Sequence, residues 1–284
     1  MRRTGHNIMT TINHLTVSYS DQGPDDAPVV IFIHGFPLNK SMWNMQVEAL
    51  KGDYRVIAYD IRGHGNSDPG IGDFFIELFV NDLLRLMEKL EIDKSILCGQ
   101  SLGGYIALNA VLKYPNRFDG LILNDTQCIA DTPEIKENRQ LTINTIKQSG
   151  VEKYADDSIK NLFVPESFST KENEIAFVKE MIMNTPKQSL CNTLHALAER
   201  KETCNRLHEI NIPVLIMVGK EDKITPIATA RQMHELIPDS ALKIIAHAGH
   251  VANLEKPAAF NFHLLKFLEL VASKSFCLSD TDGN

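Results

Sequence analysis

Short apolar runs alternate along the chain with longer stretches in which apolar residues recur every three or four positions. The runs are rich in Val, Ile and Leu, and several are continuous, as expected of strands buried on both faces of a sheet. The predicted strands cover residues 15–20, 29–33, 55–59, 95–98, 120–124, 214–218 and 242–245. Strands that alternate with helices predict an α/β fold, in which a mostly parallel central sheet is flanked by helices.

The predicted helices are recognised by apolar spacing and by proline. In FVNDLLRLMEKLEI, residues 79–92, the apolar positions fall on one face and the remaining positions are mostly charged. The stretch GGYIALNAVLKY, residues 103–114, must end before Pro115, because the residue before a proline disfavours helix. Two more helices are predicted after Pro226 and from Pro257, since proline suits the first helical position.

Residues 130–209 interrupt this alternation, because they contain helical periods but no convincing strand. We expect them to form a helical cap, inserted before the penultimate strand and covering the active end of the sheet. The α/β core would then consist of residues 10–129 and 210–272. The two ends, residues 1–9 and 273–284, are expected to be flexible.

Composition and charge exclude several classes of protein. A chain of 284 residues with 43% hydrophobic and 23% charged residues is typical of a globular domain, here with an insertion. Its net charge of -7 offers no basic surface for nucleic acid. No apolar run approaches the roughly 20 residues of a membrane span, and the N-terminus lacks the apolar stretch of a signal peptide. We therefore predict a cytoplasmic protein without nucleic-acid or membrane partners.

The cysteines and histidines indicate neither a disulfide framework nor a metal site. The chain has an odd number of cysteines, widely spread and without a C-x-x-C pair: Cys98, Cys128, Cys191, Cys204 and Cys277. They are interpreted as reduced thiols. No pair among the ten histidines has metal-ligand spacing with a carboxylate, so we expect no metal and no cofactor.

The stretch CGQSLGGY, residues 98–105, contains a candidate nucleophile. The pattern G-x-S-x-G is weak evidence alone, but here a predicted strand precedes it and a predicted helix follows it. A sharp turn at that junction would present Ser101 at the carboxyl end of the sheet. Because a free serine hydroxyl is a poor nucleophile, it needs a base, and the base needs an orienting acid.

Two histidines and two aspartates compete for these roles. His250 lies on the loop between the last predicted strand and the last helix, where a base can reach over the sheet, whereas His247 can belong to the end of the strand. Asp222 and Asp125 both follow predicted strands, and the chain order Ser, Asp, His allows either one. We prefer His250 and Asp222, with Asp125 open as the alternative acid.

An acyl-transfer site also needs donors for an oxyanion. The N–H of Leu102, the residue after the nucleophile, is one candidate. The loop IFIHGFPLNKSMW, residues 31–43, supplies the second in the N–H of Phe36. Pro37 has no N–H, and Gly35 allows the chain to turn there.

Five ordered motifs resemble the α/β-hydrolase superfamily: HGFP at 34–37, YDIRGHGNSD at 59–68, GQSLGG at 99–104, GKEDKITP at 219–226 and GHVANLEKP at 249–257. The resemblance covers roughly residues 15–270. It implies Asp222 as the acid, in G-x-x-D-x-x-x-P, and His250 as the base, in H-x-x-x-x-E-x-P. A serine in place of aspartate at the turn disfavours the haloalkane dehalogenase and epoxide hydrolase branches. Within the serine branch, the chain is similar to small carboxylesterases, 3-oxoadipate enol-lactonases and cofactor-free haloperoxidases or perhydrolases.

The expected function is hydrolysis of carboxylic esters of small to medium acyl groups through an acyl-enzyme, with a small-molecule ester as the partner. An apolar pocket is expected, and six residues are candidates for its lining: Trp43, Phe163, Phe168, Phe177, Met181 and Leu194. No oligomeric state is predicted.

Three alternatives stay open. An enol-lactonase would show a cationic cap residue facing Ser101, for which Arg200 and Lys201 are candidates. A carbon-carbon bond hydrolase of aromatic degradation would use the same groups. A low-turnover ligand-binding protein on a hydrolase scaffold would bind tightly without turnover.

Overall fold

The computed structural model describes residues 4–279, and side chains for residues 4–273. Within this range a single sheet has the strand order β1-β2-β4-β3-β5-β6-β7-β8. Its strands are β1 Gly5–Ile12, β2 Leu15–Gln22, β3 Val29–Ile33, β4 Arg55–Tyr59, β5 Ser95–Gln100, β6 Phe118–Asn124, β7 Val214–Gly219 and β8 Ser240–Ile245. The β1–β2 and β2–β4 pairs are antiparallel and the remaining pairs are parallel. Each predicted strand lies within one of these, so the predicted fold class is confirmed.

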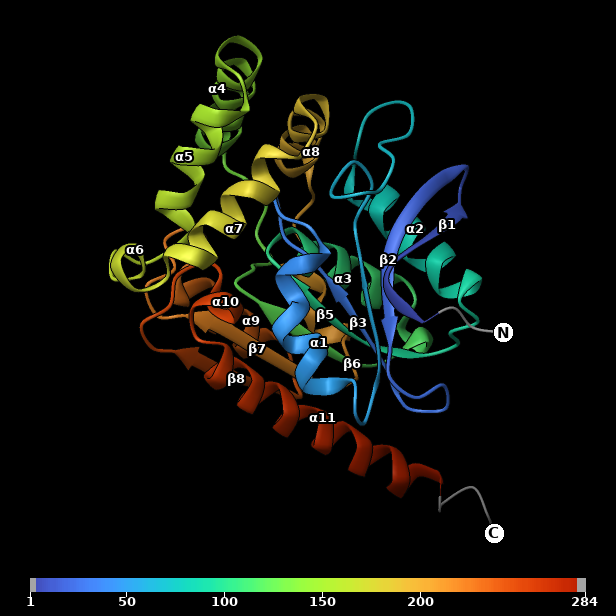
Figure 1. The fold of residues 1–284 in the computed structure, drawn as a ribbon. Coiled ribbons are helices and arrows are strands. Elements are labelled where there is room, and N and C mark those ends of the chain that lie inside the picture. Colours follow the sequence, from blue (N-terminus) through green and yellow to red (C-terminus); the bar gives the residue numbers. More distant parts are fainter. Residues whose placement is uncertain (1–3, 280–284) are drawn as a thin grey trace.

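Helices cover both faces of the sheet (Figure 1). One face carries α1 Asn44–Leu50 and α11 Pro257–Ser279, and the other carries α2 Ile76–Lys89, α3 Leu102–Lys113 and α9 Ile227–Leu236. Short helices complete the core: η1 Lys40–Trp43, η2 Pro115–Arg117 and α10 Ala252–Glu255. Strands such as β4 and β7 are buried along their whole length, because helices cover the side chains on both faces of the sheet.

A helical insertion, residues 133–199, separates β6 from β7. It comprises α4 Pro133–Ser149, α5 Val151–Leu162, α6 Ser167–Thr170, α7 Glu172–Met183 and α8 Lys187–Glu199, and the 3-10 helix η3 Cys204–Glu209 follows it. These helices lie together beyond one end of the sheet (Figure 1). None of the helices in residues 4–279 has both the length and the apolar character needed to cross a membrane.

Both ends of the chain contain regular secondary structure. Residues 5–9 belong to β1, which pairs with β2 at the edge of the sheet. The apolar pattern missed this strand because Ile8 and Ile12 are its only buried residues. Residues 273–279 continue α11, while residues 1–3 and 280–284 of the predicted termini lie outside the described residues.

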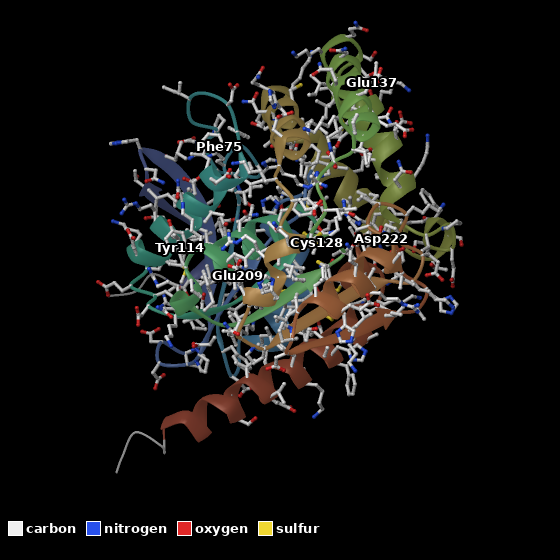
Figure 2. All side chains as sticks on the ribbon, turned by 180° about the vertical axis from the view of Figure 1, so that it is seen from behind. Phe75, Tyr114, Cys128, Glu137, Glu209 and Asp222 are labelled. Carbon is white, nitrogen blue, oxygen red and sulfur yellow. A yellow bond between two sulfur atoms is a disulfide. The ribbon has the colours of Figure 1, made fainter. Side chains whose placement is uncertain are left out.

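The prediction of reduced thiols is wrong for one pair, because Cys128 and Cys204 form a disulfide. Cys128 follows β6 and Cys204 begins η3, so the bond joins the two ends of the helical insertion; Figure 2 shows Cys128 below the insertion helices. Seventy-six positions separate the two cysteines, and only the return of the chain over the sheet brings them together. Cys98 and Cys191 are free and buried, and the side chain of Cys277 lies outside the described range.

The disulfide should stabilise the protein by restricting the unfolded chain. For a separation of 76 residues the loop-closure argument gives about 4 kcal/mol of unfolding free energy. The double variant Cys128→Ser/Cys204→Ser should therefore unfold at a clearly lower temperature than the wild type. Thermal unfolding with and without dithiothreitol checks this, because the reductant should lower the wild-type Tm and leave the variant unaffected. A wild-type Tm equal to that of the variant in both conditions would contradict the prediction.

Candidate active site

Ser101 lies on a tight turn between β5 and α3, with backbone angles φ 51° and ψ -113°. A non-glycine residue rarely adopts this positive φ, so the surroundings must impose it. The turn is tied to the neighbouring β6 region, since Ser101 N–H donates to Asn124 O at 2.9 Å and Thr126 Oγ1 donates to Ser101 O at 2.9 Å. Its glycines are needed for close approach: a Cβ on Gly103 would lie 2.1 Å from Ile33 O, and one on Gly99 would lie 2.2 Å from Gly103 O.

The structure brings the three preferred catalytic candidates into one hydrogen-bonded line. His250 Nε2 lies 2.9 Å from Ser101 Oγ, and His250 Nδ1 lies 2.8 Å from Asp222 Oδ2. All three side chains are buried. Asp222 follows β7 at the edge of the sheet that faces the insertion (Figure 2). The arrangement has the geometry of a nucleophile, a base and an orienting acid.

Asp222 is held as an acceptor. Thr225 Oγ1 donates to Asp222 Oδ2 at 2.7 Å, and the N–H groups of Ile224 and Thr225 donate to Oδ1 at 2.8 and 3.1 Å. Burial acts to raise the pKa of Asp222, but the charge of His250 and the hydrogen bonds from His250 and Thr225 outweigh burial, and the pKa is lowered. The carboxylate can therefore stay ionised beside the imidazole.

The competing histidine and aspartate lie elsewhere. The side chain of His247 is 69% exposed and its Nδ1 lies 3.5 Å from the Glu166 carboxylate. Asp125 is buried, and its Oδ1 accepts a hydrogen bond from Gly219 N–H at 2.8 Å. Burial, together with the neighbouring charge of Asp222, raises the pKa of Asp125 well above its ordinary value. In the described part of the chain it is Asp222, and not Asp125, that hydrogen-bonds His250.

The predicted oxyanion donors flank the same turn. Phe36 lines a cavity together with Ser101, and Leu102 is the first residue of α3. Within residues 4–273, neither the Phe36 N–H nor the Leu102 N–H donates to a protein acceptor. The Phe36–Pro37 peptide bond is cis. Both N–H groups are thus available for an anionic oxygen formed at Ser101.

His34 has a structural role in this loop. Its Nδ1 lies 2.8 Å from Gly35 O, and its Nε2 accepts a hydrogen bond from Ile61 N–H at 3.0 Å. Burial lowers the pKa of His34 to about 4, so the ring is neutral at physiological pH, with the proton on Nδ1. This side chain fixes the loop of Gly35 and Phe36 against the segment that follows β4.

A cavity of about 310 Å³ contains Ser101 and His250. One group of lining residues is apolar: Phe36, Ile135, Leu162, Leu194, Leu197 and Ile224. The other is polar and comes from the insertion: Asn138, Arg139, Thr142, Ser158 and Asn161. The cavity is therefore apolar on one side, as expected, but the insertion contributes a polar wall.

Most of the predicted pocket residues lie outside this cavity. Leu194 lines it, but Trp43 is buried in the sheet core between Phe32 and Phe260, at ring distances of 4.8 and 6.1 Å. Phe163, Met181 and Phe177 pack the insertion onto that core. Phe168 is 43% exposed. Helical spacing marks the buried face of a helix, but it does not separate contact with the core from contact with a ligand.

The cationic residue that lines the cavity at Ser101 is also a different one from those predicted. Arg139 of α4 lines the cavity, whereas Arg200 is buried, with its guanidinium 4.5 Å from the Tyr105 ring and 2.6 Å from the Asp131 carboxylate. Lys201 is exposed. Arg139 was missed because it lies among charged residues at helical spacing, in a pattern typical of a solvated helix face.

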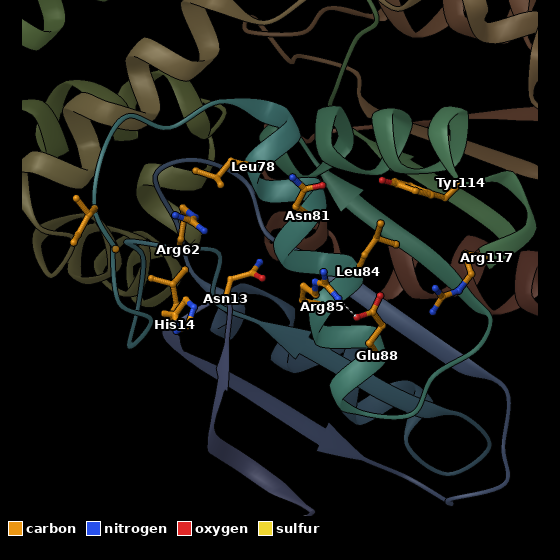
Figure 3. A pocket seen from close by; sticks show the side chains of 13 residues that line it. Asn13, His14, Arg62, Leu78, Asn81, Leu84, Arg85, Glu88, Tyr114 and Arg117 are labelled. Atoms are coloured by element: carbon orange, nitrogen blue, oxygen red, sulfur yellow. Dashed lines mark hydrogen bonds and ion pairs between the residues drawn. The ribbon is translucent and has the colours of Figure 1, made fainter.

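A larger cavity of about 730 Å³ lies between the β1–β2 turn and α2 (Figure 3). Its arginines already have partners, since Arg62 bonds Asp82, Arg85 bonds Glu88, and Arg117 donates to the main-chain oxygens of Ile92 and Asp93. No serine, threonine or cysteine is among its lining residues in the described chain. Nor do the described His, Cys, Asp and Glu side chains gather anywhere in a group that could hold a metal ion. The smaller cavity at Ser101 is therefore the candidate active site.

Comparisons with known proteins agree with this fold. The family model described as alpha/beta hydrolase fold matches residues 28–257. Among curated proteins, 3-oxoadipate enol-lactonase 1 of Acinetobacter baylyi is 30% identical over 257 residues, or 90% of this chain and 94% of that protein. Among solved structures, a thermophilic esterase from Thermogutta terrifontis with malate bound has a TM-score of 0.88 and 31% identity, covering 95% of this chain and 99% of the other. The enol-lactonase from Burkholderia xenovorans has a TM-score of 0.87 and 25% identity, covering 92% and 100%.

The family model spans more than half of the chain, and the strand order, the turn at Ser101 and the helices on both faces are consistent with it. This chain belongs to the alpha/beta hydrolase family.

Proposed function

We propose that this protein hydrolyses carboxylic esters of small to medium acyl groups through an acyl-enzyme on Ser101. The observation that carries the proposal is the hydrogen-bonded line from Ser101 through His250 to Asp222, at 2.9 and 2.8 Å, at the wall of a cavity. A cavity of about 310 Å³ suits a small ligand. In this proposal the helical insertion is the cap that closes the pocket.

The reaction would proceed in two halves. His250 Nε2 takes the Ser101 proton as Oγ bonds to the acyl carbon, and the resulting oxyanion accepts hydrogen bonds from the N–H groups of Phe36 and Leu102. Each such donor contributes on the order of 3 kcal/mol to the transition state. Collapse of this intermediate breaks the ester bond, and His250 returns the proton to the leaving alcohol. Water then attacks the acyl-enzyme while His250 takes its proton, and His250 returns that proton to Ser101 Oγ as the acyl–oxygen bond breaks, which releases the acid and restores Ser101.

A second candidate function is hydrolysis of an ester or lactone that carries a carboxylate. Arg139 faces the same cavity as Ser101, and no Asp or Glu is among the described residues that line it. Arg139 and Arg200 share one carboxylate, that of Asp131, so the group keeps one unbalanced positive charge. Relatives named as enol-lactonases, and an esterase structure with malate bound, are consistent with an anionic ligand. Arg139 is then the expected carboxylate-binding residue.

The two other functions considered from the sequence can be distinguished by assays with different substrates. A carbon-carbon bond hydrolase would consume a coloured dienoate and hydrolyse esters poorly, and a binding protein would hold a ligand without turnover. The cytoplasmic location stays a prediction. Because the cytoplasm normally keeps thiols reduced, a protein located there would have to protect the buried Cys128–Cys204 disulfide from reduction.

Hydrolysis of p-nitrophenyl esters from acetate to decanoate tests the main proposal. Wild-type activity should peak at short to medium chains, Ser101→Ala should lower kcat by about 10⁴-fold or more, and Asp222→Asn by about 10⁴-fold, because each removes a member of the proposed triad. Asp125→Asn should retain activity within a few fold and serves as the matched control. Comparable rates for wild type and Ser101→Ala, or loss of activity in Asp125→Asn alone, would refute these assignments.

The raised pKa of Asp125 predicts a dependence of stability on pH. The folded protein keeps this proton above pH 3.8, where an unfolded aspartate has lost it, so the wild-type free energy of unfolding falls as pH rises towards the folded pKa. Asparagine cannot ionise, and its amide oxygen can still accept from Gly219 N–H. The Tm of Asp125→Asn, relative to wild type, should therefore increase as pH is raised from 4 to 8. A constant Tm difference would mean that the Asp125 pKa is ordinary.

Charge selectivity tests the role of Arg139. Arg139→Gln should lower kcat/KM for mono-p-nitrophenyl glutarate, which carries a free carboxylate, by about 10- to 100-fold, as expected for the loss of a charged hydrogen bond. The neutral p-nitrophenyl butyrate should change by less than about threefold. Lys136→Gln is the control, because Lys136 belongs to the same helix but lies outside this cavity. An equal loss of kcat/KM on both substrates would show that Arg139 does not bind the substrate carboxylate.

A further inference from the structure

A buried carboxylate lies close to the proposed general base without touching its ring. Glu255, at the end of α10, is 1% exposed, and its carboxylate accepts three hydrogen bonds. Its Oε2 accepts from Gly249 N–H at 2.6 Å. Its Oε1 accepts from Val164 N–H at 2.9 Å and from Ser167 Oγ at 2.6 Å. One donor therefore comes from the loop that carries the base, and two come from the helical insertion.

The backbone of the base is tied to the insertion a second time. His250 N–H donates to Leu162 O at 2.9 Å, and a Cβ on Gly249 would lie only 2.8 Å from that same oxygen. On its other side, His250 O accepts from Gln100 Nε2 at 2.7 Å, next to the nucleophile. The peptide groups around His250 are thus held between the turn at Ser101 and residues 162–167 of the insertion.

The chemistry of Glu255 suits this tie. Burial raises the pKa of Glu255 above its ordinary value, although the hydrogen bonds from Ser167, Val164 and Gly249 act in the opposite direction. An apolar side chain would avoid the cost of burying a carboxyl, but it would leave two buried N–H groups without acceptors. A carboxylate has two oxygens and accepts all three donors at once.

We propose that Glu255 is a positioning residue that joins residues 162–167 of the insertion and the Gly249–His250 backbone into one rigid unit, so that the insertion supports the base as well as covering the substrate. The inference rests on the proposed function, in which His250 is the general base. A misplacement of a catalytic group by about 1 Å can cost on the order of 100-fold in rate. Loosening this tie should therefore slow the chemical step more than it weakens binding.

The variant Glu255→Gln tests the proposal, because it keeps the size of the side chain but places an N–H₂ group against one of the main-chain donors. Glu221→Gln is the matched control: Glu221 is exposed, and its Oε2 accepts from Ala248 N–H at 3.1 Å in the same loop, with no bond to the insertion. The measurements are kcat and KM on p-nitrophenyl acetate, corrected for the folded fraction at the assay temperature, and amide hydrogen exchange without substrate.

In Glu255→Gln, kcat should fall about tenfold or more while KM stays within about twofold, and the amides of Val164 and Gly249 should exchange at least about tenfold faster. Glu221→Gln should match the wild type in kcat and KM. If Glu255→Gln fails to fold, Ser167→Ala removes one donor only and should lower kcat by roughly two- to fivefold with KM unchanged.

Two results would overturn the proposal. Faster exchange with an unchanged kcat would show that the tie exists but does not position the base, and unchanged exchange would show that Glu255 does not hold the two segments together. A wild type that hydrolyses no ester would refute the proposed function instead, and the exchange rates would then still decide whether the tie exists.

Discussion

The close approach of backbone to backbone around Ser101 is the constraint on which the site depends. Gly103 passes so near Ile33 O, and Gly99 so near Gly103 O, that any side chain at either glycine would force the strands and α3 apart. This contact keeps the start of α3 against the carboxyl ends of β3 and β5. Ser101 is thereby held at a positive φ, with its hydroxyl towards His250.

The helical insertion contacts the rest of the site in two different ways. Its α4 and α8 helices pack on each other around a small apolar cluster and contribute Arg139 and Leu194 to the cavity. Its middle part, from the end of α5 through α6, is hydrogen-bonded to His250 N–H and to the Glu255 carboxylate. One part of the insertion therefore shapes the cavity at Ser101, while another contacts the backbone of His250.

The sequence allowed the central sheet and the candidate triad to be predicted for one physical reason. Parallel strands buried on both faces are continuous apolar runs, and their carboxyl ends meet at one edge, so polar residues that directly follow them come together. Ser101 and Asp222 follow such strands, β5 and β7, whereas His250 follows the more exposed edge strand β8. The edge strand β1 escaped notice because Ile8 and Ile12 are its only buried residues.

The other features that could not be predicted depend on how the insertion packs over the sheet and the loop of His250. Arg139 lies on a helix with an ordinary charged pattern, Glu255 was identified only as part of the H-x-x-x-x-E-x-P motif, and Cys128 is 76 positions from Cys204. Helical periodicity shows which face of a helix is buried but not what it is buried against. Phe163 and Met181 were for that reason assigned to the pocket, whereas they pack into the core.

The disulfide at the ends of the insertion has a consequence for how the two parts of the chain can change. Its Cα atoms are 4.9 Å apart, and β6 and β7, which precede and follow the insertion, pair directly with each other. The sheet thus meets the insertion at one narrow junction, much as it would meet a short surface loop. A longer, shorter or differently folded insertion could leave and re-enter at the same junction without disturbing the strands, provided that it also supplied acceptors and donors for the loop of His250 and apolar side chains to cover the core where Phe163 and Met181 pack. The insertion and the strands can therefore vary separately, except at these two contacts.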